Sequence, residues 1–497
     1  MHIAESLRLN ALRHPQKVAA ICGERRLTYK ELNRRVNRLA NAFSGLGYLP
    51  GDKVAILLYN SAEYIECFAG LTKVGLIPVP ISHLLKDSDI QAILANSDSV
   101  AGVVDDEFVD RVMSMQHGMN RVVAVNGTTA RNGVPQYEAL LAAAAATEPG
   151  DRSRMTSAIM IHSSGTTGLP KGILRSRYGL PERAIQQGFQ PDDKMLCVMP
   201  PFFSMGEACD LLSLYLGQTM VFVRKFDAEE NLRIIEQERV NATAWVVTML
   251  RDLVQAARTG EYDLSSLRLI LTSGQFSEQG KSEAFELFGP VLQSYFGSSE
   301  TGPSNFMGSA DLMIRHETNC VGKVFFGNEV VLLDEMNNEV PTGQIGRICC
   351  RGPATYDSYY NDPTTTARTV CGDYITVGDL GRFDAEGYLY FEGRSQDMIK
   401  TGGINVYAQE VESELGKHPE IKEVAVIGVP DERWSEAVKA IIVLKEGSRL
   451  SKNEIITFSK KTLSSHKAPK SVEIVDALPK NLMGKVLKEE LKKKFRL

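Results

Sequence analysis

The spacing of apolar residues predicts alternating helices and strands over roughly the first three hundred positions. The first segment predicts a helix, a hairpin and a second helix, in which residues 27–40 place apolar side chains at helical spacing behind the capping residue Thr28. A short apolar run after the Gly-Asp turn at 51–52 is typical of a buried strand, and a helix at 62–72 and a strand at 77–80 follow. This alternation continues to about residue 310 and indicates parallel α/β layers.

The pattern changes after about residue 322. Short apolar runs separated by Gly, Asp and Asn turns predict an antiparallel β unit, and the residues from about 398 predict a third unit of helices, strands and a basic C-terminal helix. We therefore expect an α/β fold in which a large N-terminal domain of α/β layers carries a β-barrel-like subdomain and precedes a small, mobile α+β C-terminal domain. The expected bounds are 1–396 for the N-terminal domain, with its β unit at about 322–396, and 397–497 for the C-terminal domain.

Composition and charge exclude several classes of protein. The chain has 497 residues, 43% of them hydrophobic and 24% charged, which is typical of a soluble globular protein of about three domain-sized units. With 56 Lys and Arg against 61 Asp and Glu, the net charge of −5 does not favour nucleic acid. The charged residues near the N-terminus argue against a signal peptide, and the lack of a long uncharged run argues against a membrane span. Eight cysteines without a Cys-x-x-Cys pair predict reduced thiols in a cytoplasmic protein.

The strongest local signal is the segment IHSSGTTGLPKGI at 161–173, which follows an apolar run. Its hydroxyls can hydrogen-bond phosphate oxygens, its glycines let backbone N–H groups turn towards one anion, and its lysine adds positive charge. The spacing differs from Gly-x-x-x-x-Gly-Lys-Ser/Thr, so an ordinary kinase or GTPase loop is not favoured. We predict a polyphosphate site formed by Ser163, Ser164, Gly165, Thr166, Thr167, Gly168 and Lys171.

This loop and four later motifs resemble those of the adenylate-forming enzymes, which include acyl-CoA synthetases, luciferases and peptide-synthetase adenylation domains. The later motifs are YFGSSETG at 295–302, VGDLG at 377–381, GRSQDMIKTGG at 393–403 and PKNLMGKVLK at 479–488. They occur in the order of the family and extend the resemblance over nearly the whole chain. The resemblance implies a two-step reaction, in which a carboxylate attacks ATP to give an acyl-adenylate and pyrophosphate, and a thiol then takes the acyl group.

The resemblance also implies roles for individual residues. It places Phe296 at the adenine, Asp379 and Arg394 at the ribose, Ser299 at the phosphates and Glu300 at a Mg²⁺ ion. The expected catalytic residues are Lys485, Glu300 and Thr167, with Lys485 as the cation where the attacking carboxylate meets the α-phosphate. Without the family motif, Asp379 would suit a turn and Phe296 a hydrophobic core.

The expected acyl pocket departs from the family pattern. Phe203 stands where histidine is common, Gln275 and Phe276 are bulkier than the usual small residues, and Gly297 completes the predicted pocket. These residues predict an apolar acid that is medium-length, cyclic or aromatic. Glu207 lies in the same stretch and either faces a cationic group or, as we expect, lies on a helix surface.

The C-terminal unit contains the residues that we expect on the side of the site where the thiol substrate enters. Gly402 and Gly403 would allow close approach of a thin pantetheine arm. Trp434 either lies under a CoA adenine or is buried. Asp397 occupies the hinge position of the family.

The leading hypothesis is an acyl-CoA synthetase that uses ATP, Mg²⁺, CoA and a carboxylic acid. An enzyme that loads an acyl group onto a carrier protein is the alternative, because CoA and carrier proteins share the pantetheine arm. Nothing in the sequence requires a luciferase-like oxygenase. A non-catalytic binding module would be expected to lose Lys485, Glu300 or Asp379, and all three are present. Both a monomer and a homodimer remain open.

Overall fold

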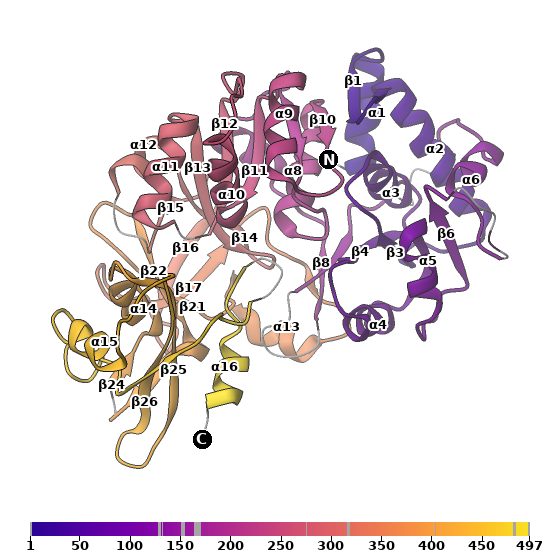
Figure 1. The fold of residues 1–497 in the computed structure, drawn as a ribbon. Coiled ribbons are helices and arrows are strands. Elements are labelled where there is room, and N and C mark those ends of the chain that lie inside the picture. Colours follow the sequence, from indigo (N-terminus) through magenta and orange to yellow (C-terminus); the bar gives the residue numbers. More distant parts are fainter. Residues whose placement is uncertain are drawn as a thin grey trace.

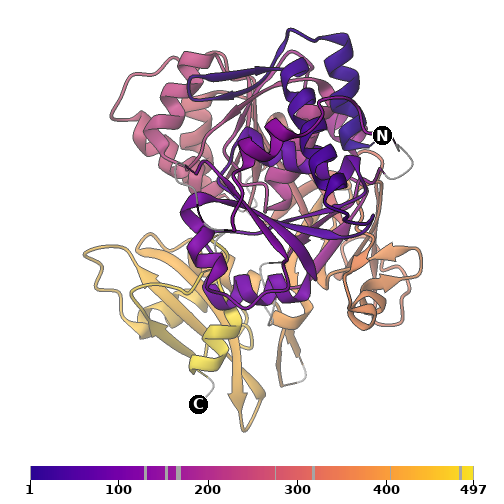
Figure 2. The same ribbon diagram turned by 90° about the vertical axis from the view of Figure 1, so that its right-hand side faces the viewer.

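The structure is a computed structural model, and its mixed α/β architecture confirms the predicted fold class (Figures 1 and 2). It describes residues 2–127, 131, 133–150, 155–163, 170–274, 276–315, 319–402, 404–480 and 484–495. Within these ranges, no helix is both long enough and apolar enough to cross a membrane.

The chain begins with the predicted helix, hairpin and helix. These are α1 (Ile3–Arg13), β1 (Val18–Cys22), β2 (Arg25–Thr28) and α2 (Tyr29–Gly45). The α2 helix begins with a capping box, in which the Glu31 backbone N–H donates to Thr28 Oγ1 at 3.2 Å and the Thr28 N–H donates to Glu31 Oε2 at 2.8 Å. The predicted cap is therefore confirmed.

Two largely parallel sheets form the body of the N-terminal part (Figure 1). The first has the strand order β4-β3-β5-β6. Its unit contains β3 (Lys53–Leu57), α3 (Ala62–Lys73), β4 (Ile77–Pro80), α4 (Asp87–Asn96), β5 (Ser99–Asp105), α5 (Asp106–Met113), β6 (Arg121–Val125) and α6 (Tyr137–Ala143). The predicted strand at 77–80 and the helix at 62–72 are both confirmed.

The second sheet runs parallel from β1 through β10, β9, β11 and β12 to β13. Its unit contains α7 (Leu180–Gln187), β9 (Lys194–Cys197), α8 (Ser204–Leu216), β10 (Thr219–Phe222), α9 (Ala228–Glu238), β11 (Ala242–Val246), α10 (Val247–Ala257), β12 (Leu269–Ser273), α11 (Glu278–Phe288) and β13 (Leu292–Ser298). The preceding strands β7 (Ile159–His162) and β8 (Gly172–Arg175) pair antiparallel in a separate small sheet. One apolar core includes side chains of α8 and of both sheets, so α8 lies inside the domain.

Antiparallel strands extend this sheet into the predicted β unit. The unit contains β14 (Gly302–Met307), α12 (Ser309–Ile314), β15 (Cys320–Val324), β16 (Glu329–Leu333), β17 (Gly346–Arg351), β18 (Ser358–Tyr359), α13 (Pro363–Thr369), β19 (Val370–Cys371), β20 (Tyr374–Ile375), β21 (Asp379–Phe383) and β22 (Leu389–Arg394).

The C-terminal unit has its own apolar core and is drawn in gold and yellow in Figures 1 and 2. It contains η2 (Ser395–Asp397), β23 (Ile399–Thr401), β24 (Ile404–Val406), α14 (Ala408–Gly416), β25 (Ile421–Asp431), β26 (Ser435–Leu444), α15 (Lys452–Ser459), β27 (Ser471–Ile474) and α16 (Lys488–Phe495). The predicted mixture of helices and strands is confirmed, and the predicted basic C-terminal helix is α16.

Candidate active site

The predicted phosphate loop connects the two strands of a hairpin. Strands β7 and β8 pair antiparallel, with His162 opposite Gly172. The Ser163 N–H donates to the Lys171 carbonyl at 3.0 Å, and the Lys171 N–H donates to Ser163 Oγ at 3.1 Å. These bonds close the base of the loop and leave Lys171 at its rim. The predicted residues Ser164, Gly165, Thr166, Thr167 and Gly168 lie outside the described ranges.

Tyr359 links the phosphate loop to the predicted metal carboxylate. Its hydroxyl donates to Glu300 Oε1 at 2.6 Å, and Lys171 Nζ lies 5.3 Å from the centre of its ring. Burial and the Glu300 carboxylate raise the pKa of Tyr359 above its usual value, so the phenol remains a donor. Lys171 and Glu300, which are far apart in sequence, are thereby brought together. Tyr359 lies in none of the motifs found in the sequence, so it was not predicted.

Strand register positions the predicted ribose pair. Asp379 begins β21, Arg394 ends β22, and the two residues lie directly opposite each other. Arg394 Nε donates to Asp379 Oδ1 at 3.1 Å. Burial raises the pKa of Asp379, while the positive charges of Arg394 and Lys485 act in the opposite direction. Asp379 is therefore held at a strand end by an adjacent guanidinium.

The predicted adenine-side residues lie at the end of β13. The ring of Phe296 is half-buried, and its centre lies 5.3 Å from that of Phe391. Gly297 occupies an irregularity in the pairing of β13 with β14, where a Cβ would lie 2.0 Å from the Gly302 carbonyl oxygen. Only glycine fits this approach of two backbones. Ser299 and Glu300 form the turn that follows.

The C-terminal unit brings Lys485 to the same region. Gly484 has φ of +75°, and a Cβ there would lie 3.3 Å from Thr248 Cγ2, so this segment docks on α10. Lys485 interacts electrostatically with Asp379, Asp397 and Arg394. Partial dehydration by the surrounding protein and the Arg394 charge lower the pKa of Lys485 to about 8, although solvent still reaches the side chain.

The predicted acyl-pocket residues pack on two faces of the second sheet. Phe203 directly precedes α8, packs against the core between the sheets, and has its ring centre 4.7 Å from that of Phe202. Phe276 packs against the cluster of Trp245 on the opposite face. Gln275 lies outside the described ranges. A pocket shared by these residues stays a prediction.

The expectation that Glu207 lies on a helix surface is wrong. Glu207 is fully buried, and its Oε2 accepts a hydrogen bond from Arg175 Nη1 at 2.9 Å. The physical reason is the position of α8, which is surrounded by protein along most of its length. Its cationic partner is Arg175 of the protein itself, and a pairing of Glu207 with a cationic substrate group stays a prediction.

Comparison with known proteins identifies the family. The family model described as AMP-binding enzyme matches residues 7–360, and the model described as AMP-binding enzyme C-terminal domain matches residues 410–485. The chain belongs to the AMP-binding enzyme family. The resemblance to adenylate-forming enzymes is thus confirmed.

Relatives of this AMP-binding enzyme match it over almost its full length. Indoleacetate–CoA ligase of Aromatoleum aromaticum is 31% identical over 99% of this chain and 98% of its own. Fatty acid–[acyl-carrier-protein] ligase ScoC of Streptomyces coeruleorubidus is 30% identical over 99% of this chain and 96% of its own. The structure of ATP-bound MatB from Rhodopseudomonas palustris matches with a TM-score of 0.88 at 26% identity, covering 100% of this chain and 99% of that one.

The predicted thiol-side residues Gly402 and Trp434 of this AMP-binding enzyme lie in the turns of two neighbouring hairpins, which pair through β23 and β26. The Gly402 N–H donates to the Trp434 carbonyl at 2.8 Å, and Gly402 has φ of +57°. Trp434 is 39% exposed, so it is not the buried tryptophan of the alternative interpretation. In Figures 1 and 2 the turn between β25 and β26, which carries Trp434, projects away from the N-terminal part. Gly403 lies outside the described ranges.

The predicted hinge lies at the junction of the two parts. Asp397 ends the short η2 helix between β22 and β23, and its carboxylate lies 3.6 Å from Lys492 Nζ on the C-terminal helix. It falls between the two segments matched by the family models. The domain boundary at 397 and the hinge role stay predictions.

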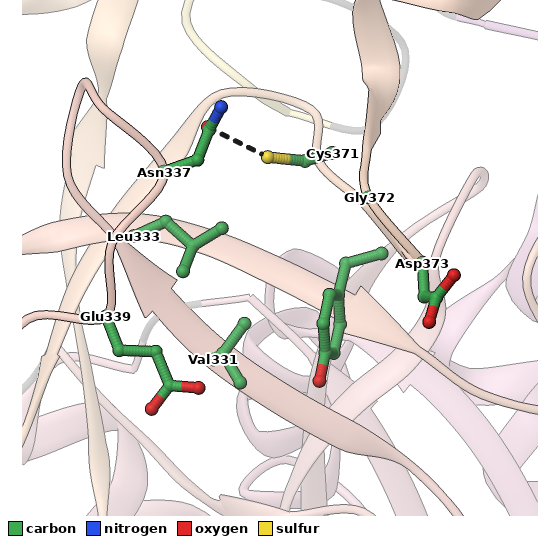
Figure 3. Close-up of a pocket in the computed structure, with 8 residues that line it drawn as sticks. Val331, Leu333, Asn337, Glu339, Cys371, Gly372 and Asp373 are labelled. Carbon is green, nitrogen blue, oxygen red and sulfur yellow. Dashed lines mark hydrogen bonds between the residues drawn. The ribbon is translucent and has the colours of Figure 1, made fainter.

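A separate cavity of about 250 Å³ lies in the β unit (Figure 3). Its wall includes Val331, Leu333 and Tyr374, and beside it the Cys371 thiol donates to Asn337 Oδ1 at 3.0 Å. The residues that line this cavity include none of the predicted site residues. It is therefore distinct from the candidate active site.

Proposed function

We propose that this protein activates a carboxylic acid with ATP to form an acyl-adenylate and then transfers the acyl group to CoA. The observation that carries the proposal is the convergence of Lys171, Glu300, the Asp379–Arg394 pair and Lys485 from distant segments of the chain. Relatives at 31% and 32% identity are named as CoA ligases, which supports an acid–thiol ligase.

In the first step, the acid carboxylate attacks the α-phosphorus of ATP. An oxygen–phosphorus bond forms to the acid, and the bond to pyrophosphate breaks. Lys485 would offset the negative charge where the carboxylate meets the phosphate, and Lys171 would stabilise the departing pyrophosphate. Both lysines would act as fixed charges near the reacting groups, which is the main contribution proteins make to such transfers.

Glu300 fits a Mg²⁺ ion bound mainly through phosphate oxygens. Such ions commonly take only one or two protein carboxylates. In the part of the chain that the structure describes, no group of three or more His, Cys, Asp or Glu residues forms an all-protein metal site. The hydrogen bond from Tyr359 would hold the Glu300 carboxylate towards the phosphates. The bound ion would neutralise charge on the phosphates.

Asp379 and Phe296 would hold the nucleoside. The Asp379 carboxylate would accept hydrogen bonds from the ribose hydroxyls, while Arg394 orients it and its positive charge opposes protonation. The exposed part of the Phe296 ring would pack against adenine. Fixing the nucleoside in this way places the α-phosphate for in-line attack.

The second step requires another arrangement of the C-terminal unit. MatB from Rhodopseudomonas palustris matches with a TM-score of 0.88 in its ATP-bound form but 0.78 in its apo form, at the same 26% identity. This difference supports an adenylation pose for the structure described here. Gly402 and Trp434 would reach the acyl-adenylate after rotation about Asp397. The thiol would then attack the acyl carbonyl, and AMP would leave.

A carrier protein is the alternative acyl acceptor, supported by the relative named as a ligase of acyl carrier protein. A cytoplasmic location belongs to the same proposal, because eight cysteines without a Cys-x-x-Cys pattern suit a reducing compartment.

The test measures pyrophosphate release with ATP and Mg²⁺ over a panel of aliphatic, cyclic and aromatic acids, with CoA, with a pantetheinylated carrier protein, or with neither. The proposal expects acid-dependent pyrophosphate and AMP, and an acyl-CoA product by mass spectrometry. Glu300→Gln, which removes the charge at nearly constant volume, is the matched control. Release of ADP and phosphate, or acyl transfer only to the carrier protein, would contradict the proposal.

A further inference from the structure

One face of α8 leads from Phe203 into the interior of the protein and carries two acidic residues. Phe203, Glu207 and Asp210 are spaced by four and three residues, so they share one side of the helix. Glu207 is 0% exposed and Asp210 is 1% exposed. Charged groups are rarely fully buried unless they are paired, so this stripe calls for a physical explanation.

Arg175 pairs with the first of these acids. It is 1% exposed, and its Nη1 donates to Glu207 Oε2 at 2.9 Å. Arg175 is the last residue of β8, the strand that leaves the phosphate loop at Gly172. The ion pair therefore joins the strand of the phosphate loop to the helix of the predicted acyl pocket.

A second buried arginine lies nearby. Arg183 of α7 is 5% exposed, and its Nε donates to the Tyr178 carbonyl at 2.8 Å. Its charge acts on Glu207 and on Tyr295, which directly precedes Phe296. The charged cluster thus lies behind three parts of the candidate site: the phosphate loop, the start of α8 and the end of β13.

The pair keeps unused hydrogen-bonding capacity. Among the described residues, Arg175 Nε and Nη2 and Glu207 Oε1 are buried without a hydrogen-bond partner. Two tightly packed residues whose polar atoms are only partly hydrogen-bonded can form the wall of a pocket. Removal of one of them leaves the other able to bind a group of opposite charge.

We propose that the Arg175–Glu207 ion pair is the floor of the acyl pocket and determines which acids the enzyme accepts. This inference rests on the proposed function. The floor lies one helical turn, about 6 Å, beyond Phe203 along α8. It restricts the substrate to short or medium acids whose tails are uncharged and end before the pair. A longer tail would have to separate a buried ion pair, and a second carboxylate would meet the Glu207 carboxylate of that pair.

The test removes the acid and keeps the base. In Glu207→Ala, space opens beside a buried guanidinium that has lost its partner. A dicarboxylic acid can then supply the missing carboxylate. We expect kcat/KM for a dicarboxylic acid, relative to the monocarboxylic acid of equal chain length, to rise at least about tenfold over the wild-type ratio. The matched control is Glu207→Gln, which removes the charge but keeps the volume. In this variant kcat/KM should not rise for any acid with a longer chain.

A second variant allows for the possibility that Glu207→Ala does not fold. Arg175→Met combined with Glu207→Ala removes both charges and leaves an apolar extension. It should favour longer monocarboxylic acids at least about tenfold and give dicarboxylic acids no advantage. The opposite responses of the two variants separate a charged floor from general loosening of the pocket.

Two measurements distinguish a failure of the proposed function from a failure of the inferred pocket floor. Pyrophosphate release gives the acid preference, and the melting-temperature shift with each acid reports binding without turnover. If the wild type releases no pyrophosphate with any acid, the proposed function fails, and the melting shifts still test the floor. If folded variants show the wild-type acid preference in both measurements, the floor lies elsewhere and the inference is wrong.

Discussion

Lys485 should impose a sharp alkaline limit on adenylation. Partial dehydration and the neighbouring Arg394 charge lower the pKa of Lys485 from the usual 10.5 to about 8. The ammonium is the active form because it offsets the charge of the carboxylate and phosphate. Deprotonation as pH rises through the pKa therefore removes activity. With a pKa of about 8, about half of the free enzyme is active at pH 8 and about one-tenth at pH 9.

Three further effects are expected from the same role of Lys485. Bound ATP brings negative charge to Lys485, so the fall in kcat should occur at higher pH than the fall in kcat/KM. Lys485→Ala should lose roughly 10²–10³-fold in adenylation, by analogy with other positioned charge-stabilising donors, and should show no break near pH 8. Lys485→Arg keeps the charge at every accessible pH and should also lack the break.

The assay is pyrophosphate release from ATP and acid between pH 6.5 and 9.5, with thioester formation from a supplied acyl-adenylate as the comparison. Lys485→Ala should slow the first half-reaction and spare the second. An unchanged alkaline break in Lys485→Arg, or equal losses in both half-reactions of Lys485→Ala, would refute the assigned role.

The other predictions concern the hinge, the pocket and the metal carboxylate. Asp397→Pro should fix the junction and spare one half-reaction while crippling the other, and a folded variant with an unchanged melting temperature that runs both normally would exclude the hinge. Phe276→Ala should admit bulkier acids, with about 1–3 kcal/mol of discrimination per removed methylene, and substitutions at Phe203 and Gln275 should also change the acid profile. Unchanged profiles for all three would place the pocket elsewhere. Tyr359→Phe removes the donor to Glu300 and should raise the Mg²⁺ concentration for half-maximal activity at least about tenfold, whereas an unchanged Mg²⁺ titration would contradict that role.

Local patterns were sufficient for most of the fold. The capping residue Thr28 and the apolar spacing behind it predicted α2, and the change to short strands predicted the β unit. The family motifs also named Asp379 and Arg394, which the register of two adjacent strands brings together.

The sequence could not show contacts that depend on packing between distant elements. Glu207 looked like a surface residue because nothing in its local sequence shows that α8 is enclosed by protein. Tyr359 was missed because its partner Glu300 is 59 residues away. Phe203 and Phe276 were expected together, yet their surroundings differ because they pack on opposite faces of one sheet.

The most direct test of the central claim follows the oxygen atoms of the acid. A substrate acid labelled with ¹⁸O in both carboxylate positions is incubated with the protein, ATP, Mg²⁺ and CoA, and the products are analysed by mass spectrometry. An acyl-adenylate requires one labelled oxygen in AMP, because the thiol breaks the bond between the acyl carbon and that oxygen. Labelled inorganic phosphate together with ADP, or unlabelled AMP, would contradict the mechanism.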